Sequence, residues 1–400
     1  MFTFLLVIIY LSFISLGLPD SLLGSAWPAM YKDLAVSLST QGVLSMLISG
    51  GTIISSLFSG KLIKRFGTGK LTFISVAMTA VALLGFSISP SFIWLCVMAI
   101  PLGLGGGSVD AALNNFVALH YKAKHMSWLH CFWGVGATVG PIIMSMFMGK
   151  SNGWKKGYFT ISMIQFGLVI ILFLTLSLWK TVEKVQDENE IKEEQEEADG
   201  KSSMKIPGVK LALLSFACYC AAESTAGLWG SSYLVNYKGV SVGDAARWIS
   251  LFYIGITAGR FLSGFFTMKF SNSTLIRGGQ VLCIIGAVVL LMPLPTSFSM
   301  LGLILFGLGC APIYPSMIHD TPKRFGKNAS QAIIGLQMAF AYMGSTFMPP
   351  LFGILVSKIS IGVFPCFLLA YVFIMIISSE KINKLISRKQ KTAEKIEMKV

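Results

Sequence analysis

Long apolar stretches and short polar interruptions alternate along the chain. An α-helix that crosses the hydrocarbon core of a bilayer needs about 20 residues, and the first stretch contains Pro19 and Asp20 and lacks a basic leader. We therefore expect that stretch to be a membrane span and not a cleaved signal peptide. The pattern predicts an all-α membrane protein with twelve transmembrane helices. The apolar stretches are residues 3–30, 41–60, 70–89, 92–118, 128–149, 156–179, 208–235, 246–268, 274–292, 298–318, 329–356 and 362–379.

Composition and charge agree with a membrane location. Hydrophobic residues make up 54% of the 400 residues and charged residues 12%, against roughly 25% charged in soluble domains. A net charge of +14 would suggest nucleic acid as a partner of a soluble protein, but the basic residues lie mostly in alternate loops. Because Lys and Arg stay on the cytoplasmic side, we expect a plasma-membrane protein with both termini in the cytoplasm and no nucleic-acid partner. The expected cytoplasmic basic residues are Lys61, Lys64, Arg65, Lys70, Lys122, Lys124, Lys269, Arg277, Lys323, Arg324, Lys327 and those of the segment 381–399.

An acidic segment separates the first six apolar stretches from the last six. Residues 181–206 contain clustered Glu and Asp with scattered Lys, a composition typical of a solvated linker. The predicted organisation is an N-terminal six-helix bundle at 1–180, the cytoplasmic linker at 181–206, a C-terminal six-helix bundle at 207–380 and a basic cytoplasmic tail at 381–400. We expect the tail to contact anionic lipid.

The two halves repeat one another. Residues 20–24 match residues 223–227 at an offset of 203 (223 minus 20), with an acidic residue first in each. Residues 102–105 match residues 306–309 at an offset of 204 (306 minus 102), with glycines in the same places. Two six-helix bundles of the same topology form a pseudo-symmetric pair, for which a central cavity and alternating access are expected.

Three of the 18 acidic residues lie well inside predicted spans: Asp20, Asp110 and Glu223. An ionised carboxylate near the bilayer centre costs roughly 2.5 to 3.5 kcal/mol even on the insertion scale. Burial disfavours the charged form of a carboxyl group, so each acid is a candidate for binding a proton and releasing it when water enters. We expect Asp20 or Asp110 to carry the coupled proton and Glu223 to contribute more to substrate hydroxyls. Sodium as the coupling ion, or a hydrogen bond to a neighbouring helix without any coupling role, stays open.

Polar and aromatic side chains near these acids are suited to a sugar, which presents hydroxyl groups around a ring with an apolar face. Trp27 follows Asp20 by seven residues and shares its helical face, and Asn114 lies one turn after Asp110. Packing or an interfacial belt is the alternative role for each aromatic residue. The expected substrate-binding residues are Trp27, Asn114, His130, Trp133, Glu223, Trp229, Tyr233, Tyr314, Gln337 and Tyr342.

Residues 60–70, Gly-Lys-Leu-Ile-Lys-Arg-Phe-Gly-Thr-Gly-Lys, resemble the signature loop of the major facilitator superfamily, G-x-L-x-D-R-x-G-x-[RK]-[RK]. Lys64 stands where that pattern has Asp, so the latch attributed to this acid in the family must use other contacts here. The resemblance implies the twelve-helix major facilitator fold. We expect Arg65 in this loop and Arg260 in the eighth span to be gating residues.

Further motifs are similar to the fucose permease branch of that superfamily. They are Gly17-Leu18-Pro19-Asp20, Asp110 with Asn114, Glu223, and Gly259-Arg260. This likeness implies uptake of a neutral monosaccharide together with a proton. It also implies that the carboxylates of the first and fourth spans, which are Asp20 and Asp110 here, take part.

No enzyme chemistry is indicated. His120, His125 and His130 are five residues apart, which does not gather three ligands on one helical face, and all seven cysteines lie inside predicted spans. We find no nucleophile with a base and no phosphate loop, and we interpret His319-Asp320 as a solvated turn between the tenth and eleventh spans. We expect no metal, no cofactor, a sugar-like small molecule and the lipid bilayer as partners, and a monomer.

Two other functions remain open. A proton-coupled exporter of drugs or metabolites would have the same fold, and residues 136–141, Gly-Ala-Thr-Val-Gly-Pro, resemble the Gly-Pro motif of antiporters, although its trailing glycines are replaced by Ile142-Ile143-Met144. A receptor that senses its ligand without moving it would also keep this pattern.

Overall fold

The computed structural model describes residues 2–121, 123–179, 204–267 and 269–397. Within them all regular structure is helical, so the predicted all-α class is confirmed. Twelve described helical stretches are long and apolar enough to cross a membrane, the first of them made of two consecutive helices, which confirms the predicted number of spans. Their bounds are Thr3–Asp33, Leu38–Phe66, Thr68–Ser87, Phe92–Val117, Trp128–Phe147, Gly153–Leu174, Val209–Asn236, Val242–Phe266, Asn272–Leu291, Phe298–Phe325, Ala332–Lys358 and Ile361–Ser387.

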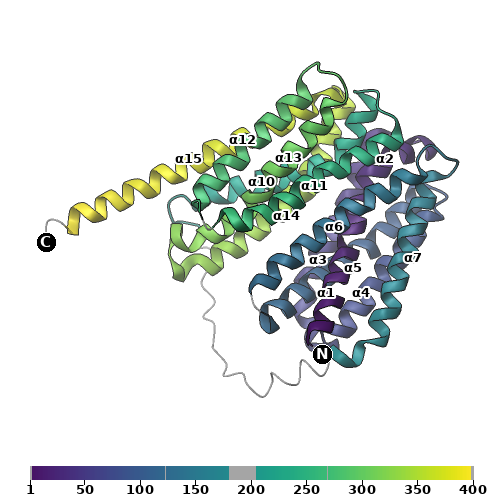
Figure 1. Ribbon diagram of the computed structural model, residues 1–400, viewed down its shortest axis with the longest axis horizontal. Coiled ribbons are helices and arrows are strands. Elements are labelled where there is room, and N and C mark those ends of the chain that lie inside the picture. Colours follow the sequence, from purple (N-terminus) through teal and green to yellow (C-terminus); the bar gives the residue numbers. More distant parts are fainter. Residues whose placement is uncertain (1, 122, 180–203, 268, 398–400) are drawn as a thin grey trace. The chain divides into compact units, whose positions relative to one another are not determined.

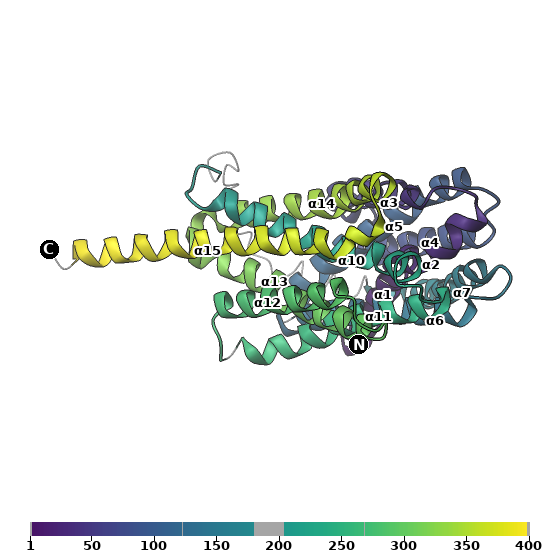
Figure 2. The same ribbon diagram turned by 90° about the horizontal axis from the view of Figure 1, so that it is seen from above.

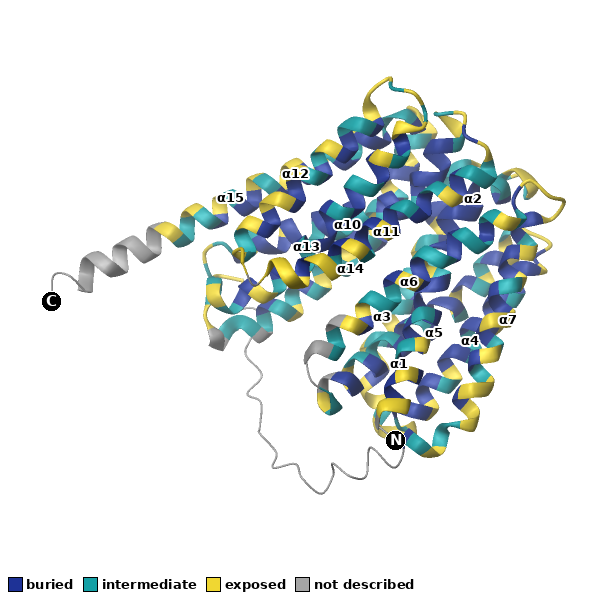
Figure 3. Cartoon of the chain, viewed as in Figure 1, coloured by how far each residue is buried: buried dark blue, intermediate teal, exposed yellow. Residues whose placement is uncertain are grey.

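The N-terminal helices pack in definite pairs (Figures 1 and 2). The most extensive contacts join α3 to α5, α4 to α5, α1 to α6, and α4 to α7. Buried positions gather where these helices face one another, and exposed positions lie on the outward faces and loops (Figure 3). The helices are α1 (Phe2–Asp20), α2 (Leu22–Asp33), α3 (Gln41–Phe66), α4 (Thr68–Ser87), α5 (Phe92–His120), α6 (Ala123–Phe147) and α7 (Gly153–Leu174), with a 3-10 turn η1 at Leu38–Thr40.

In the C-terminal half α12 packs extensively against α13 and also contacts α15. The helix α15 continues without a break through the basic segment after residue 380, which had been expected as a tail (Figure 1). The helices are α10 (Val209–Asn236), α11 (Val242–Phe266), α12 (Asn272–Leu291), α13 (Phe298–Phe325), α14 (Lys327–Lys358) and α15 (Phe364–Glu397), with a 3-10 turn η2 at Ile361–Val363.

By contacts, the chain divides into two compact units. Their boundaries cut through α10, α11 and α14, whereas the domains predicted from the sequence follow the internal repeat. Contacts between residues and an internal sequence repeat are different criteria for dividing a chain, so the predicted domain boundaries stay a prediction. Most of the predicted linker lies outside the described residues. The first unit comprises 1–193, 227–254 and 349–362, and the second comprises 194–226, 255–348 and 363–400, each as far as it is described.

Glycines allow the closest helix contacts, as expected for membrane bundles. A Cβ atom added to Gly17 of α1 would collide with the carbonyl oxygen of Trp133 in α6, and one added to Gly136 of α6 would collide with that of Ile14. The helices α3 and α5 also approach each other closely at a glycine, because a Cβ at Gly103 would collide with the carbonyl oxygen of Ile48. Only backbones without side chains approach this closely, so the glycines fix which helices touch.

The interpretation of His319-Asp320 as a solvated turn was wrong. Both residues lie inside α13, which extends to Phe325. The Asp320 side chain is 8% exposed and its Oδ2 accepts a hydrogen bond from Arg324 Nε at 2.5 Å, one turn later. Asn272 of α12 also donates to Asp320 Oδ1, at 3.3 Å. The helix continues beyond the end of the apolar pattern because an ion pair at (i, i+4) spacing compensates the charges of its last turns.

Candidate functional site

A break in the first span positions Asp20. Pro19 has no N–H, so it leaves the carbonyl of Ser15 without its usual helical donor, and α1 ends at Asp20 before α2 begins at Leu22. Gln165 of α7 supplies the missing bond. Its Nε2 donates to the Ser15 carbonyl at 2.5 Å, and its Oε1 accepts from Ser15 Oγ at 2.7 Å. The buried amide of Gln165 therefore braces the break.

The Asp20 carboxylate is exposed although it lies inside a span. Its Oδ2 accepts a hydrogen bond from the indole Nε1 of Trp133 at 2.7 Å. The close contact of α1 with α6 through Gly17 and Gly136 brings the two side chains within reach. The sequence predicts Asp20 or Asp110 for the proton and Trp133 for the substrate, and the structure brings Asp20 and Trp133 together.

Asp110 lies on α5 and is half-buried. Asn114, one turn later, donates from Nδ2 to Asp110 Oδ1 at 2.8 Å and to the Asp110 carbonyl at 2.9 Å. Asp110 and Asp20 lie on helices that contact each other, α5 and α1.

Glu223 on α10 has a different kind of partner. Arg260 of α11 donates from one terminal nitrogen to Glu223 Oε1 at 3.3 Å, and each side chain is 18% exposed. Aromatic rings lie near on the same unit: the ring centroids of Phe216 and Tyr314 are 5.0 Å apart, and those of Tyr219 and Tyr314 are 6.0 Å apart. The second unit thus contains an ion pair beside an aromatic cluster.

Three of the predicted substrate-binding residues are fully buried and occupied by packing. Trp27 donates from Nε1 to the Leu38 carbonyl at 2.9 Å. Trp229 donates to the Pro349 carbonyl at 3.0 Å. Tyr233 is 1% exposed and stacks on a neighbouring tyrosine ring. Such side chains have no surface to offer a solute in this conformation, so the structure gives these three predictions no support.

The other predicted residues are scattered. His130 is exposed on α6 and lies edge-on to Phe13, and Tyr342 is half-buried on α14. The guanidinium of Arg65 is exposed at the end of α3, 5.4 Å from the ring centre of Phe66. Tyr314 donates from its hydroxyl to Met338 Sδ at 3.3 Å.

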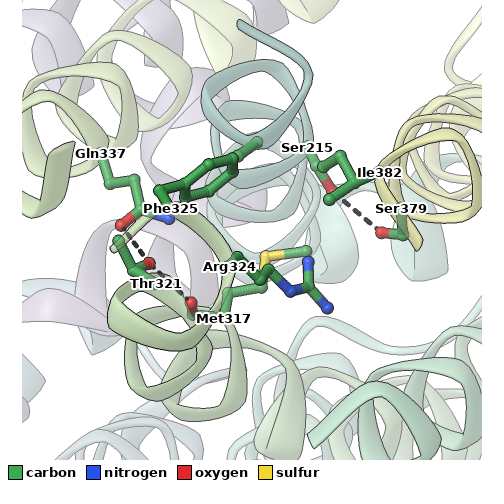
Figure 4. Close-up of a pocket in the computed structure, with 9 residues that line it drawn as sticks. Ser215, Met317, Thr321, Arg324, Phe325, Gln337, Ser379 and Ile382 are labelled. Atoms are coloured by element: carbon green, nitrogen blue, oxygen red, sulfur yellow. Dashed lines mark hydrogen bonds between the residues drawn. The ribbon is translucent and has the colours of Figure 1, made fainter. Parts of the chain in front are cut away.

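Gln337 lies in a small pocket of the second unit (Figure 4). Its Oε1 accepts a hydrogen bond from Thr321 Oγ1 at 3.0 Å, and Arg324 and Ser215 also line the pocket. This places Gln337 against the last turns of α13. Its observed contacts are therefore those of helix packing.

Gln165 was missed by sequence reasoning. The sequence shows it as a single amide inside a mostly apolar stretch. Pro19 separately indicates that the carbonyl four residues earlier, at Ser15, lacks its helical donor. Nothing in the sequence joins these two features, because they are far apart along the chain. The partner of Asp20 was hidden for the same reason, since Trp133 lies 113 residues away.

Comparison with curated proteins finds distant relatives. Bypass of stop codon protein 6 of Saccharomyces cerevisiae is 26% identical over 279 residues, which is 64% of this chain and 56% of the yeast protein. The chain thus spans little more than half of that relative. The glucose/mannose transporter GlcP of Bacillus subtilis is 23% identical over 316 residues, covering 76% of this chain and 77% of the relative.

Solved structures share the fold at low sequence identity. A bacterial homologue of the human lysosomal transporter Spinster superposes with a TM-score of 0.74 at 12% identity, covering 96% of this chain and 97% of the other. A D-xylose-proton symporter gives a TM-score of 0.68 at 14% identity, covering 93% and 96%.

The family comparison covers nearly the whole chain. The model described as Major Facilitator Superfamily matches residues 9–349 and 211–392. This match identifies the protein as a transporter and not an enzyme, and the twelve spans and the solved structures agree with it on the fold. This chain belongs to the major facilitator superfamily.

Proposed function

We propose that the protein is a secondary active transporter that moves a monosaccharide together with a proton by alternating access. The observation that carries this proposal is the kind of hydrogen-bond partner that each predicted acid in the spans has. Asp20 is held by an indole and Asp110 by an amide, both neutral donors. A carboxylate held by a neutral group can take up a proton without leaving a cation unpaired.

Glu223 is suited to another role. Its partner Arg260 is a permanent cation, and protonating Glu223 would leave that charge unpaired in a partly buried place. We therefore assign the coupled proton to Asp20 and Asp110. Glu223 belongs with Tyr314 and Tyr342 as a group for substrate hydroxyls, and Arg260 acts through its ion pair with Glu223.

The sugar-like substrate rests on two further supports. Asn114, His130 and Trp133 bring an amide, an imidazole and an indole to the same bundle as the two acids, which is the mixture of polar and aromatic groups that a sugar requires. Among the similar proteins, one is named for glucose and mannose and another for D-xylose and a proton. We propose a plasma-membrane monomer with cytoplasmic termini.

The main alternative is a proton-coupled exporter. It rested on the likeness of residues 136–141 to an antiporter motif, and these residues have a packing explanation. A Cβ at Gly136 or Gly140 would meet the backbone of α1, at the carbonyl oxygens of Ile14 and Leu18. The glycines are needed for helix contact whichever direction transport takes, so the motif favours neither direction.

The test is uptake into liposomes that contain the purified protein, with an imposed pH gradient, labelled hexoses and pentoses, and a protonophore control. We expect one sugar to accumulate when the gradient is present and to equilibrate when the protonophore is added. Replacing the proton gradient by a sodium gradient separates the two coupling ions. Accumulation of no sugar, together with expulsion of a hydrophobic dye, would instead establish the exporter.

A further inference from the structure

The indole of Trp133 is placed to act on the proton-binding step. It donates from Nε1 to Asp20 Oδ2 at 2.7 Å, within the short range typical of hydrogen bonds to a charged acceptor. The indole N–H is a donor only, so it stabilises the acceptor more when that acceptor is ionised. Trp133 is half-buried, which strengthens the bond relative to one in water.

The backbone around this contact is held firmly. Gly17, one turn before Asp20, lies directly against the carbonyl of Trp133, and the carbonyl of Ile14 lies against Gly136. From α7, Gln165 fixes the break that ends α1 at Asp20. Both the carboxylate and the indole are therefore carried by backbone that has little freedom to separate.

We propose that Trp133 is a positioning residue for the proton at Asp20: its indole N–H holds the carboxylate in its ionised form and sets the pH at which Asp20 takes up a proton. This inference rests on the proposed proton symport. When Asp20 binds a proton, its acceptor oxygen loses most of its charge and the bond to α6 weakens. Proton binding at α1 is thereby communicated to α6, on which the candidate substrate group His130 also lies.

Titratable and charged groups on the helices around Asp20 also influence its proton binding. On α5, which contacts α1, the acidic group is Asp110. On α6, His130 lies one turn before Trp133, and on α1 the nearest titratable neighbour is Tyr10, whose hydroxyl bonds to His125. The charged residues of the other helices packed against α1 lie in their first or last turns: Lys32 and Asp33 of α2, Lys70 of α4, and Lys155 and Lys156 of α7.

Two substitutions separate the N–H group from the ring, and a third serves as their control. Trp133→Phe keeps an aromatic ring and removes the donor. Trp133→Gln removes the ring and restores an N–H at a similar distance from the backbone. Trp94→Phe is the matched control, because the indole of Trp94 donates to the backbone carbonyl of Gly85 at 2.8 Å, away from both acids.

The readout is the infrared carboxyl band of the purified protein in lipid, followed as a function of pH, with Asp20→Asn identifying the band of Asp20. Loss of one charge-assisted hydrogen bond is expected to raise the midpoint of that band by about 1 pH unit in Trp133→Phe. The midpoint should return toward that of the unchanged protein in Trp133→Gln and stay unchanged in Trp94→Phe. An unchanged midpoint in Trp133→Phe, or the absence of any band that Asp20→Asn removes, would overturn the inference.

This titration needs no substrate, so it separates the inference from the proposed function. If the midpoint of Trp133→Phe shifts as expected but no sugar is taken up in response to the gradient, only the transport proposal is rejected. Gradient-driven sugar uptake whose pH dependence is the same in Trp133→Phe and the unchanged protein would reject only the role of Trp133. If Trp133 serves purely as a sugar platform, the KM for the sugar rises in Trp133→Gln, and the pH profile of uptake by Trp133→Phe equals that of the unchanged protein. This result also rejects the inference.

Discussion

The three carboxyl groups that the sequence predicts well inside the spans have chemically different surroundings. Asp20 and Asp110 are bound by neutral donors, whereas Glu223 is paired with the cation Arg260. A proton can bind to the first two without creating an isolated charge. At Glu223 the same event would leave Arg260 unpaired, which makes this residue a poor proton carrier and a good fixed anchor.

The amide substitutions Asp20→Asn and Asp110→Asn test this distinction. Each removes a site for the proton while keeping shape and polarity, so we expect gradient-driven accumulation of substrate to fall to the level of protein-free liposomes. Exchange of labelled for unlabelled substrate across the membrane needs no net proton movement and should continue. Measuring accumulation and exchange on the same preparation decides the matter, and loss of neither would remove both acids from the coupling role.

The ion pair of Glu223 with Arg260 predicts a stability effect. Glu223→Gln leaves a guanidinium that is 18% exposed without its carboxylate, at a cost below the roughly 3–5 kcal/mol measured for fully buried pairs. The double variant Glu223→Gln with Arg260→Gln should recover much of that loss. Thermal unfolding of the detergent-solubilised protein measures both.

The pair of Arg277 with Glu380 is a natural control. It has two short bonds of 2.6 and 2.8 Å, yet its side chains are 54% and 34% exposed. Solvent screening limits such pairs to about 1 kcal/mol or less, so Glu380→Gln should change the unfolding temperature little. A larger effect there than at Glu223 would contradict the assignment of Glu223 as the buried anchor.

At the scale of elements, the contact of α1 with α6 is set by glycines. Gly136→Ala would place a methyl group against the carbonyl oxygen of Ile14, and overpacking of this kind costs roughly 1–3 kcal/mol. Because the helices must then separate, we expect a lower unfolding temperature and weaker pH-driven uptake. The matched control is Gly167→Ala on α7, where an added Cβ meets no atom within 4 Å. Equal effects of the two substitutions would show that the contact is not tight.

The break between α1 and α2 depends on Gln165. Gln165→Leu preserves size and removes both bonds to Ser15, leaving a buried carbonyl unsatisfied at a cost of about 1–3 kcal/mol. Gln165→Glu keeps only an acceptor and should not restore the bond to the Ser15 carbonyl. We expect both variants to unfold at lower temperature and to move Asp20, so that the infrared midpoint of Asp20 also changes. Unfolding at the original temperature would mean that another group satisfies the carbonyl.

At the scale of the whole molecule, the distribution of Lys and Arg predicts the orientation in the membrane. Ser151 lies between α6 and α7 in an expected outer loop, and Lys70 lies in the first turn of α4 at an expected cytoplasmic end. A membrane-impermeant maleimide should label Ser151→Cys in intact cells and Lys70→Cys only after permeabilisation. The unchanged protein controls for the native cysteines, among which Cys366 is exposed. The reverse labelling pattern would invert the orientation.

The number and approximate place of the spans followed from the sequence, and so did the positions of Asp20, Asp110 and Glu223 inside them, whereas the position of Asp320 inside a span did not. Span length is a property of consecutive residues, because each helix satisfies its own backbone hydrogen bonds. The end of α13 was misjudged because the pair of Asp320 with Arg324 makes polar residues acceptable in a helix. The predicted platforms Trp27 and Trp229 were judged only by helical spacing, which cannot distinguish a face turned to a neighbour from one turned to a solute.

What the sequence determined by itself is therefore the twelve-helix class, the internal repeat and the presence of Asp20, Asp110 and Glu223 inside spans. Only the tertiary structure decided that Trp133 binds Asp20, that Gln165 replaces the bond lost at Pro19 and that Arg260 pairs with Glu223. The physical reason is that hydrophobic length and helical periodicity act locally along the chain. The partner of a polar group depends instead on how closely two helices approach and how each is rotated about its axis.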